Sequence, residues 1–431
     1  MLSASMCMSR YGVSIIIAAS VSFLLVLLSF SESFSSSAID YAHKAQDYLK
    51  PASSSDIYNC EDPYRRPGYL YIDPETYKNT RWIPYTNEFL DAETPSYAEY
   101  PVKGDVFFNR TEVEPAFLDS TSNPQQWMHR AVAEDERRRK AVSVKKDDQT
   151  PEDFVSMKDG GGLDWLWGRR VLIFGDSVDR YMMLFFCEEF GRTIQQPKEH
   201  TTATCVIPSL NLTMVHWHFA GSWPGRPEWW WMDDMKEVAF EDRWAKIWAP
   251  TLNTSVRGPT GQPDLLMWQN GLWDERALWE LGEAHYDVNN TMGQRERQLV
   301  WQEIRFVAAR MKKFVQRVSA EFKGVPTMFR AITVHRESNA RDANIYELDR
   351  LSRAIAEHAD HETFEWGRLI SGFSMLYKDQ THPGKGAGSW LWANMILEYL
   401  ARSAGVKDEA RSPYFNGWDA CHSHLTGWGG R

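Results

Sequence analysis

The strongest constraint on the fold of this chain is a short stretch, residues 171–182, in which a strand pattern changes into a helix pattern. The apolar run Val171–Phe174 is typical of a short buried strand, and from Val178 onward apolar residues recur at helical spacing. The tripeptide Gly175–Ser177 between them is typical of a tight turn, since all three residue types are common in turns. A strand that enters a helix in this way presents Ser177 where the free N–H groups of the helix can stabilise an oxyanion. Ser177 is therefore a candidate nucleophile.

Strand and helix patterns alternate along the rest of the chain. We expect strands at residues 213–220, 264–268 and 325–334, and amphipathic or apolar helices at residues 302–322, 346–359 and 389–404. Strands that alternate with helices predict an α/β sandwich around a mostly parallel sheet. In such a sheet, functional residues collect at the carboxyl ends of the strands.

Two further polar motifs follow apolar segments and can complete a site with the serine. Asn270 follows the strand pattern at 264–268, where its side-chain amide could donate to an oxyanion beside the Ser177 N–H. Asp379 and His382 are three residues apart, so the carboxylate could orient the imidazole and His382 could act as the general base. Each motif is common by itself, and their combination favours a serine-based catalytic site.

The first 56 residues predict the cellular location. Arg10 precedes residues 13–30, an 18-residue apolar run without a charge, and acidic residues such as Glu32 follow it. This order predicts a cytosolic tail at 1–12 and a transmembrane signal anchor at 13–30, with the remainder of the chain on the lumenal side. A cleaved signal peptide and a secreted protein are the alternative. The Ser- and Ala-rich segment 31–56 is predicted to be a stem.

Glycosylation motifs support a location in the secretory pathway, for which the Golgi is our expectation. Asn-x-Ser/Thr motifs have a function only in chains that meet the glycosylation machinery. The four predicted acceptors are Asn109, Asn211, Asn253 and Asn289.

The cysteine count allows two disulfides on the lumenal side. Cys7 precedes the predicted anchor, and the other four cysteines permit three pairings. We favour Cys187–Cys205, which would tie the helix after the serine to the next strand. The remaining pair, Cys60–Cys421, would then tie the N-terminal segment to the tail.

Composition indicates which partners the protein can bind and divides the lumenal part into two regions. A net charge of −10 and a pI of about 5.7 argue against nucleic acid as a partner. The 20 tryptophans exceed ordinary usage, and flat aromatic side chains can stack on sugar rings. Residues 57–165 are rich in aromatic residues and prolines without a clear period, so we expect an irregular subdomain packed against a catalytic domain at 166–431. Within it, the mixed-charge run from Glu134 is interpreted as a solvated helix or loop.

These motifs together resemble a known superfamily. Gly175–Ser177, Asn270 and the Asp379-x-x-His382 motif are similar to the conserved blocks of the SGNH/GDSL hydrolases. Arg180, three residues after the serine, resembles the PC-esterase branch, which includes the trichome-birefringence-like polysaccharide O-acetyltransferases. The Phe329–His335 segment and the aromatic segments at 69–73 and 81–84 are also similar to that branch. Unlike those plant enzymes, this chain continues after the histidine with Pro383 rather than Trp-Cys.

The resemblance implies a fold and a set of roles. It implies an SGNH-like three-layer sandwich in which Ser177, Asp379 and His382 are catalytic. It also implies that Asn270 and Gly221 complete the oxyanion hole. Residues that would contact substrate in that branch are Arg180, Arg330 and His335, although ion pairs and hydrogen bonds within the protein are an equally good interpretation of all three.

The resulting hypothesis is a lumenal serine O-acetyltransferase that acts on a glycan through an acyl-enzyme, with no bound cofactor and an unknown acyl donor. One alternative is a carbohydrate O-acetyl esterase, in which water is the acceptor. A second is a non-catalytic glycan-binding protein of the same fold. Metal binding by the histidine pairs His216/His218 or His422/His424 is a minor alternative, and we expect no metal site.

Overall fold

The structure is a computed structural model, and every part of it described below belongs to one compact unit, Asn59–Cys421. It describes residues 61–92, 115–159, 161–224, 235–259, 261–285, 299–337, 342–411 and 414–421. The predicted tail, anchor and stem lie outside these ranges, as do Cys60, Asn109 and Asn289. None of the helices in the described ranges is long and apolar enough to cross a bilayer.

A six-stranded, mostly parallel sheet organises the fold, with strand order β4-β5-β3-β6-β7-β8. The edge strand β4 runs antiparallel to β5, and all other neighbours are parallel. The mostly parallel α/β sheet predicted from the sequence is therefore confirmed. The strands are β3 (Arg170–Gly175), β4 (Thr202–Ile207), β5 (Leu212–His218), β6 (Leu265–Trp268), β7 (Thr327–Arg330) and β8 (Glu362–Phe364).

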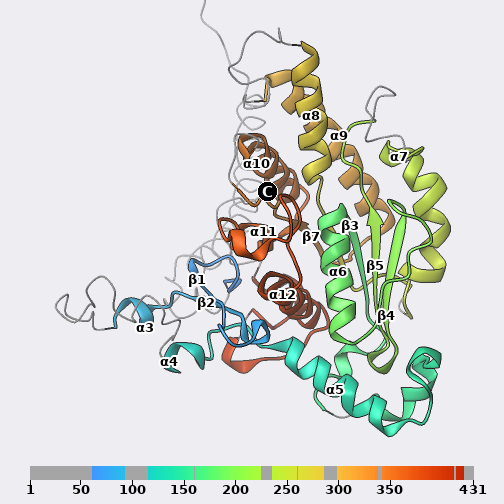
Figure 1. Cartoon of the computed structure of the whole chain (residues 1–431), viewed down its shortest axis with the longest axis vertical. Coiled ribbons are helices and arrows are strands. Elements are labelled where there is room, and N and C mark those ends of the chain that lie inside the picture. The colour runs from blue at the N-terminus through green and yellow to red at the C-terminus, as the bar shows by residue number, and fades with distance from the viewer. Residues whose placement is uncertain are drawn as a thin grey trace, which may run out of the picture. The chain divides into compact units, whose positions relative to one another are not determined.

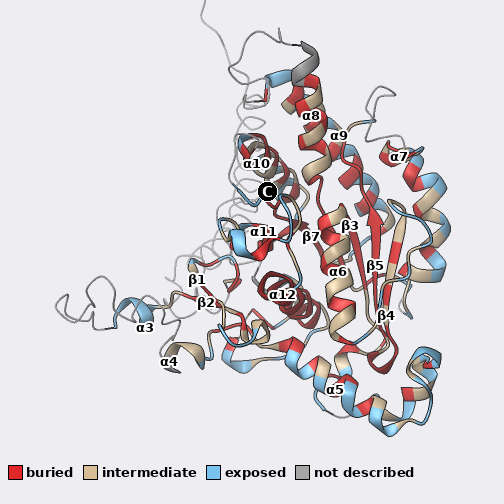
Figure 2. Cartoon of the chain, in the orientation of Figure 1, coloured by how far each residue is buried: buried red, intermediate tan, exposed pale blue. Residues whose placement is uncertain are grey.

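Helices cover both faces of the sheet. Successive side chains of a strand point to opposite faces, so apolar strands such as β3 leave apolar side chains on both faces that the helices bury. Val171 and Ile173 of β3 pack in one apolar cluster, whereas Leu172 and Phe174 pack in the other. The first cluster includes α5 (Trp127–Ala141), α6 (Ser177–Glu189) and α12 (Ala387–Ser403). The second includes α8 (Gly271–His285), α9 (Trp301–Glu321) and α10 (Asp342–His358). Figure 1 shows these elements, and Figure 2 shows that α12 is buried along its length.

The aromatic N-terminal segment packs on this sandwich. Leu70 and Trp82 belong to the same apolar cluster as α12, and the Tyr399 hydroxyl of α12 donates to the Asp62 carboxylate over 2.7 Å. The segment contains a two-stranded antiparallel sheet of β1 and β2. Its strands and the remaining short helices are β1 (Gly68–Tyr71), β2 (Arg81–Pro84), α3 (Asn87–Leu90), α4 (Pro115–Leu118), α7 (Phe240–Arg243) and α11 (Trp366–Leu369).

The mixed-charge run on α5 differs in part from its prediction as a solvated segment. Glu134, Asp135 and Arg138 are buried, and Arg138 Nη1 donates to the Ser209 carbonyl oxygen over 2.9 Å. These three residues can be buried because opposite charges four residues apart on the helix pair with each other, as Arg138 does with Glu134, whereas Glu136, Arg137 and Lys140 are exposed as predicted. The charges on this face therefore join α5 to the end of β4 instead of facing water.

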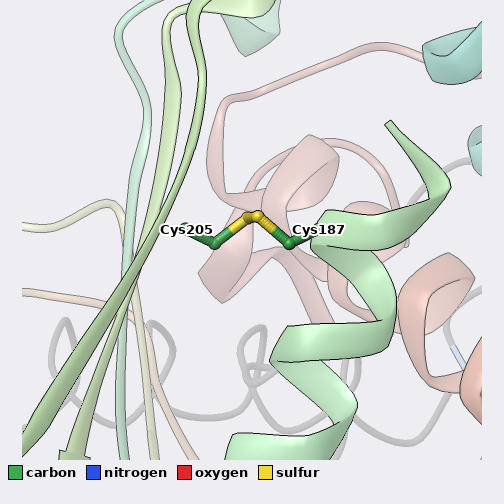
Figure 3. The surroundings of a disulfide bond; sticks show 2 residues. All are labelled: Cys187 and Cys205. Carbon is green, nitrogen blue, oxygen red and sulfur yellow. A yellow bond between two sulfur atoms is a disulfide. The ribbon is translucent and has the colours of Figure 1, made fainter. Parts of the chain in front are cut away.

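One of the two predicted disulfides lies within the described residues. Cys187 of α6 and Cys205 of β4 are bonded, and both are fully buried (Figure 3). The bond ties the helix that begins at Ser177 to the edge strand, as the sequence predicts. The second predicted pair lies outside the described residues, since Cys60 and the side chain of Cys421 are not described.

The two described glycosylation motifs differ in environment. Asn253 is exposed, whereas Asn211 is half-buried and its backbone has a positive φ of 46°. The Asn211 carbonyl oxygen accepts a hydrogen bond from the Gly168 N–H over 3.1 Å. Of the two, Asn253 is the more accessible predicted acceptor.

Candidate active site

The turn between β3 and α6 is shaped by its neighbours in the sequence. Asp176 caps the helix, because its carboxylate accepts a hydrogen bond from the Val178 N–H over 2.8 Å. Ser177 is consequently the first residue of α6, next to the free N–H groups of the first turn. Gly175 has to be a glycine, because a Cβ at this position would collide with the carboxylate of Asp179.

The structure brings together the three residues predicted to be catalytic. Ser177 Oγ lies 2.8 Å from His382 Nε2, although 205 residues separate them in the chain. His382 Nδ1 lies 3.0 Å from each carboxylate oxygen of Asp379. Burial would raise the pKa of Asp379, but hydrogen bonds from the Thr381 and His382 N–H groups and from the imidazole outweigh it and lower the pKa. A carboxylate that stays ionised can hold the imidazole in one tautomer.

Residues 377–383, the loop that carries Asp379 and His382, are held against the segment that follows β7. The Tyr377 hydroxyl donates to the Val334 carbonyl oxygen over 2.9 Å, and the Arg336 N–H donates to the Gln380 carbonyl oxygen over 2.9 Å. His382 therefore reaches Ser177 from a loop that is anchored to the segment after β7.

Tyr181 packs against the catalytic imidazole. Its ring meets the His382 ring edge to face at 5.0 Å between centroids. Two cations contact the same tyrosine ring, with Lys378 Nζ 3.1 Å and the Arg180 guanidinium carbon 4.8 Å from its centroid. Tyr181 therefore packs between the imidazole on one side and contacts with two cations, and it limits the rotation of the imidazole.

The register of the sheet places both predicted oxyanion residues at the same edge as Ser177. The last residue of β3 pairs with the last residue of β5, and Phe174 pairs with the last residue of β6. Gly221 follows β5 by three residues, and Asn270 follows β6 by two. The Leu272 N–H lies 3.5 Å from an Asp176 carboxylate oxygen, which joins the segment after Asn270 to the catalytic turn.

A buried carboxylate links these two oxyanion candidates. Asn270 Nδ2 donates to Asp274 Oδ2 over 2.9 Å, and the Ser222 N–H donates to Asp274 Oδ1 over 2.6 Å. The Ser352 hydroxyl donates to Asn270 Oδ1 over 2.8 Å. Gly221 has a φ of 84°, which favours glycine.

Of the three predicted substrate-contacting residues, Arg180 has the position closest to that role. Its side chain is 15% exposed and lies beside Tyr181. Its contacts within the protein are long, at 3.3 Å to Gln196 Oε1 and 3.7 Å to Glu199 Oε1. The guanidinium is therefore held loosely at the edge of the site.

Arg330 and His335 are partners within the protein, the second of the two roles considered for them. Each forms contacts with a carboxylate of the protein. Arg330 is buried, with Nε 2.6 Å from Asp179 Oδ1 and Nη2 3.0 Å from Asp179 Oδ2. His335 is also buried, and its Nδ1 lies 3.2 Å from Asp342 Oδ1. Of the two roles considered for Arg330, this geometry favours the internal ion pair over substrate contact, because the guanidinium is enclosed and its charge is paired. His335 is likewise enclosed beside the start of α10.

One histidine of the pair on β5, His216, supports the turn between β3 and α6. His216 Nε2 lies 3.0 Å from the carbonyl oxygens of both Gly175 and Asp176, so a protonated Nε2 donates to the turn. Burial lowers the pKa of His216 to about 4 and lowers the pKa of His218 well below its ordinary value. No group of three or more metal-ligating side chains occurs among the described residues, and His422 and His424 lie outside them.

The roles of four residues at this site were not predicted from the sequence. Asp176, Asp179 and His216 shape the turn, and Asp274 holds the oxyanion candidates. Asp274 follows Asn270 by four residues, a spacing that places two side chains on one face of a helix. That spacing is the one signal that could have indicated it.

Comparisons with known proteins give only weak similarities. No family model matches the chain, and no curated protein matches it. Among solved structures, an acetylxylan esterase from Geobacillus stearothermophilus is 14% identical, with 56% of this chain and 96% of that chain covered and a TM-score of 0.31. An α/β hydrolase enzyme from the metagenome of Lake Arreo is 16% identical, with 54% and 95% covered and a TM-score of 0.32. A putative GDSL-like lipase from Parabacteroides merdae is 11% identical, with 56% and 97% covered and a TM-score of 0.32. TM-scores this low carry no functional argument.

Proposed function

We propose that this protein is a serine esterase that removes acyl groups, acetyl foremost, from a carbohydrate through an acyl-enzyme. The observation that carries the proposal is the chain of hydrogen bonds from Ser177 Oγ through the imidazole of His382 to Asp379. In this arrangement a serine can lose its proton as it attacks an ester. The resemblance of the motifs to SGNH enzymes supports the same assignment.

The proposed reaction begins with attack by Ser177. As Ser177 Oγ bonds to the ester carbonyl carbon, its proton passes to His382 Nε2, and the carbonyl oxygen becomes an oxyanion. Collapse of the intermediate breaks the bond to the alcohol oxygen, which takes the proton from His382. Asp379 stabilises the imidazolium throughout. Water then attacks the acyl carbon while His382 Nε2 takes its proton. The bond to Ser177 Oγ breaks, Ser177 Oγ regains the proton from His382, and the carboxylic acid leaves.

The oxyanion would be stabilised at the carboxyl edge of the sheet. The proposed donors are the Ser177 N–H, the second N–H of the Asn270 amide and the backbone N–H at Gly221. Each donor aimed at the developing charge contributes roughly 3–4 kcal/mol to the stability of the transition state.

Solvent access favours water over a sugar hydroxyl as the acceptor. The side chain of Asp379 is 48% exposed and that of His382 is 23% exposed. Because a site open to this extent does not exclude water from the acyl-enzyme, hydrolysis is the simplest outcome. The transferase hypothesis drawn from the sequence resemblance requires an acceptor sugar that competes with this water.

The first experiment tests both the nucleophile and the acceptor. Purified protein is treated with a fluorophosphonate probe and, separately, with acetylated xylan and other acetylated polysaccharides. We expect probe labelling and acetate release, and we expect both to be lost in Ser177→Ala. For Ser177→Ala, kcat for acetate release should decrease by at least about 10⁴-fold, because only the residual rate of a site without a nucleophile remains.

The design also contains the contrary outcomes. Probe labelling that persists in Ser177→Ala would exclude Ser177 as the nucleophile. A third reaction supplies 4-nitrophenyl acetate together with a deacetylated oligosaccharide. Acetylated oligosaccharide formed faster than free acetate would replace the esterase by the transferase.

A further inference from the structure

We infer that Asp274 is a positioning residue that holds both proposed oxyanion donors, Asn270 and the backbone at Gly221, beside the nucleophile. The inference rests on the proposed function and assigns a role to a buried acid that the reaction steps above do not use. Asp274 lies in the first turn of α8, four residues after Asn270.

The two oxygens of Asp274 serve two different strand ends. Oδ2 accepts the hydrogen bond from Asn270 Nδ2 after β6, over 2.9 Å. Oδ1 accepts the hydrogen bond from the Ser222 N–H after β5, over 2.6 Å. Since Ser177 follows β3, which lies between β5 and β6, the carboxylate joins the two segments on either side of the nucleophile.

The backbone at Gly221 is fitted closely to this carboxylate. A Cβ at Gly221 would collide with Asp274 Oδ1 and would lie 3.2 Å from the Asp274 backbone nitrogen. The positive φ of Gly221 turns the chain toward the helix at this point. The contact therefore fixes the position of the backbone whose N–H is proposed to face the oxyanion.

The Asn270 amide is oriented by partners at both ends. Its oxygen accepts the hydrogen bond from Ser352, so the nitrogen is the end directed to Asp274. A side-chain amide nitrogen carries two hydrogens, and Asp274 takes one of them. The second hydrogen is left to donate to the oxyanion.

The charge of Asp274 is balanced by hydrogen bonds rather than by an ion pair. Asp274 is fully buried, and no cation of the described chain forms an ion pair with it. Burial raises the pKa of Asp274 to about 6, and the hydrogen bonds from Asn270 and Ser222 oppose that rise. A carboxylate can accept from two N–H donors at once, which a neutral amide with only one acceptor atom cannot do in the same geometry.

Asp274→Asn is the direct test, because it keeps the size of the side chain but replaces one acceptor oxygen with a donor. We expect kcat for acetate release to fall by roughly 10- to 100-fold, the loss typical of misplaced transition-state donors, while KM changes by less than about threefold. Rates are normalised to the serines titrated by the fluorophosphonate probe, so that a smaller folded fraction does not affect the comparison. Glu275→Gln, a neighbouring buried acid of the same helix, is the matched control and should retain the wild-type kcat.

A double-mutant cycle separates positioning from general stability. If Asp274 acts in part through Asn270, Asp274→Asn should lower kcat by a smaller factor in the Asn270→Ala background than in the wild-type protein. Ser352→Ala removes only the other partner of the amide and should stay within about fivefold of wild type, because Asp274 still holds the nitrogen.

The outcomes distinguish this inference from the proposed function. An unchanged kcat per titrated site in Asp274→Asn would overturn the positioning role while the esterase stands. Full additivity with Asn270→Ala would overturn the assignment of Asn270 to Asp274. A wild-type protein that neither reacts with the probe nor releases acetate would overturn the esterase and this inference together.

Discussion

At the scale of single residues, a buried ion pair lies next to the turn that carries Ser177. Arg330 at the end of β7 contacts the carboxylate of Asp179, one turn into α6, and Gln269 Nε2 donates to the same carboxylate over 3.1 Å. Burial raises the pKa of Asp179 to about 6, and the charge of Arg330 opposes that rise. Because Gly175 packs against the side chain of Asp179, the Arg330–Asp179 ion pair helps to fix the position of the turn that carries Ser177.

Removing the cation alone should be strongly destabilising. Arg330→Met leaves the Asp179 carboxylate buried without its counter-ion, and the free energy of unfolding should fall by about 3–5 kcal/mol. Urea unfolding measures this difference. The double variant Arg330→Met/Asp179→Asn should recover part of the loss, because it removes both charges.

A surface pair provides the control for that measurement. Lys140 and Glu136 lie 3.7 Å apart with side chains 80% and 52% exposed, so Lys140→Met should leave the unfolding curve almost unchanged. If Arg330→Met behaves like Lys140→Met, the buried pair does not support the turn.

At the scale of elements, the strand β5 supports the turn between β3 and α6. All its residues are buried, and His216 donates from β5 to the carbonyl oxygens of Gly175 and Asp176. A histidine enclosed in this way stays neutral in the folded protein. Its protonation in the unfolded chain then links stability to pH.

The sign of this linkage gives a differential prediction for His216→Gln. Folding lowers the pKa of His216 from about 6.5 to about 4, so between these values the unfolded chain binds a proton that the folded chain does not. Wild-type stability should therefore fall as the pH decreases from about 6.5 toward 4, by at most about 1.4 kcal/mol per pH unit from this residue. The variant lacks this contribution, and its amide can still donate to one carbonyl oxygen.

Urea unfolding of both proteins at pH 7, 6 and 5 measures the effect. The stability advantage of wild type over His216→Gln should shrink as the pH decreases. A constant difference across the series would show that His216 is not held neutral.

At the scale of the whole molecule, the sandwich depends on contacts between segments far apart in the chain. The N-terminal segment, α5 and α12 share one apolar cluster with the sheet, and the disulfide Cys187–Cys205 closes the link from α6 to β4. A buried disulfide is typical of proteins that fold in an oxidising compartment.

Loss of this disulfide should weaken the whole unit. The two cysteines are 18 residues apart, and closing a loop of that length contributes about 3 kcal/mol to the free energy of unfolding. Cys187→Ala/Cys205→Ala should be destabilised by about that amount in guanidinium unfolding, and a reducing agent should then have no further effect through this bond. Equal stability of wild type and variant under oxidising conditions would contradict the prediction.

The sequence by itself determined the local elements and the chemistry available at the strand ends. The patterns at 302–322, 346–359 and 389–404 correspond to α9, α10 and α12 within a few residues, because apolar periodicity reports which face of a helix is buried. The same local logic indicated a strand, a turn and a helix around Ser177. The pairing of Asp379 with His382 also follows from their short separation.

Only the tertiary structure decided which distant residues meet. Arg330 and Asp179 are 151 residues apart, so no periodicity in either segment could indicate that burial would pair their charges. The same holds for Asp274, which reaches the segment after β5 because the parallel register aligns three strand ends. Local patterns specify where a chain turns and which side chains are available there. The burial and charge pairing that distinguish a substrate contact from a structural partner arise only once the sheet has assembled.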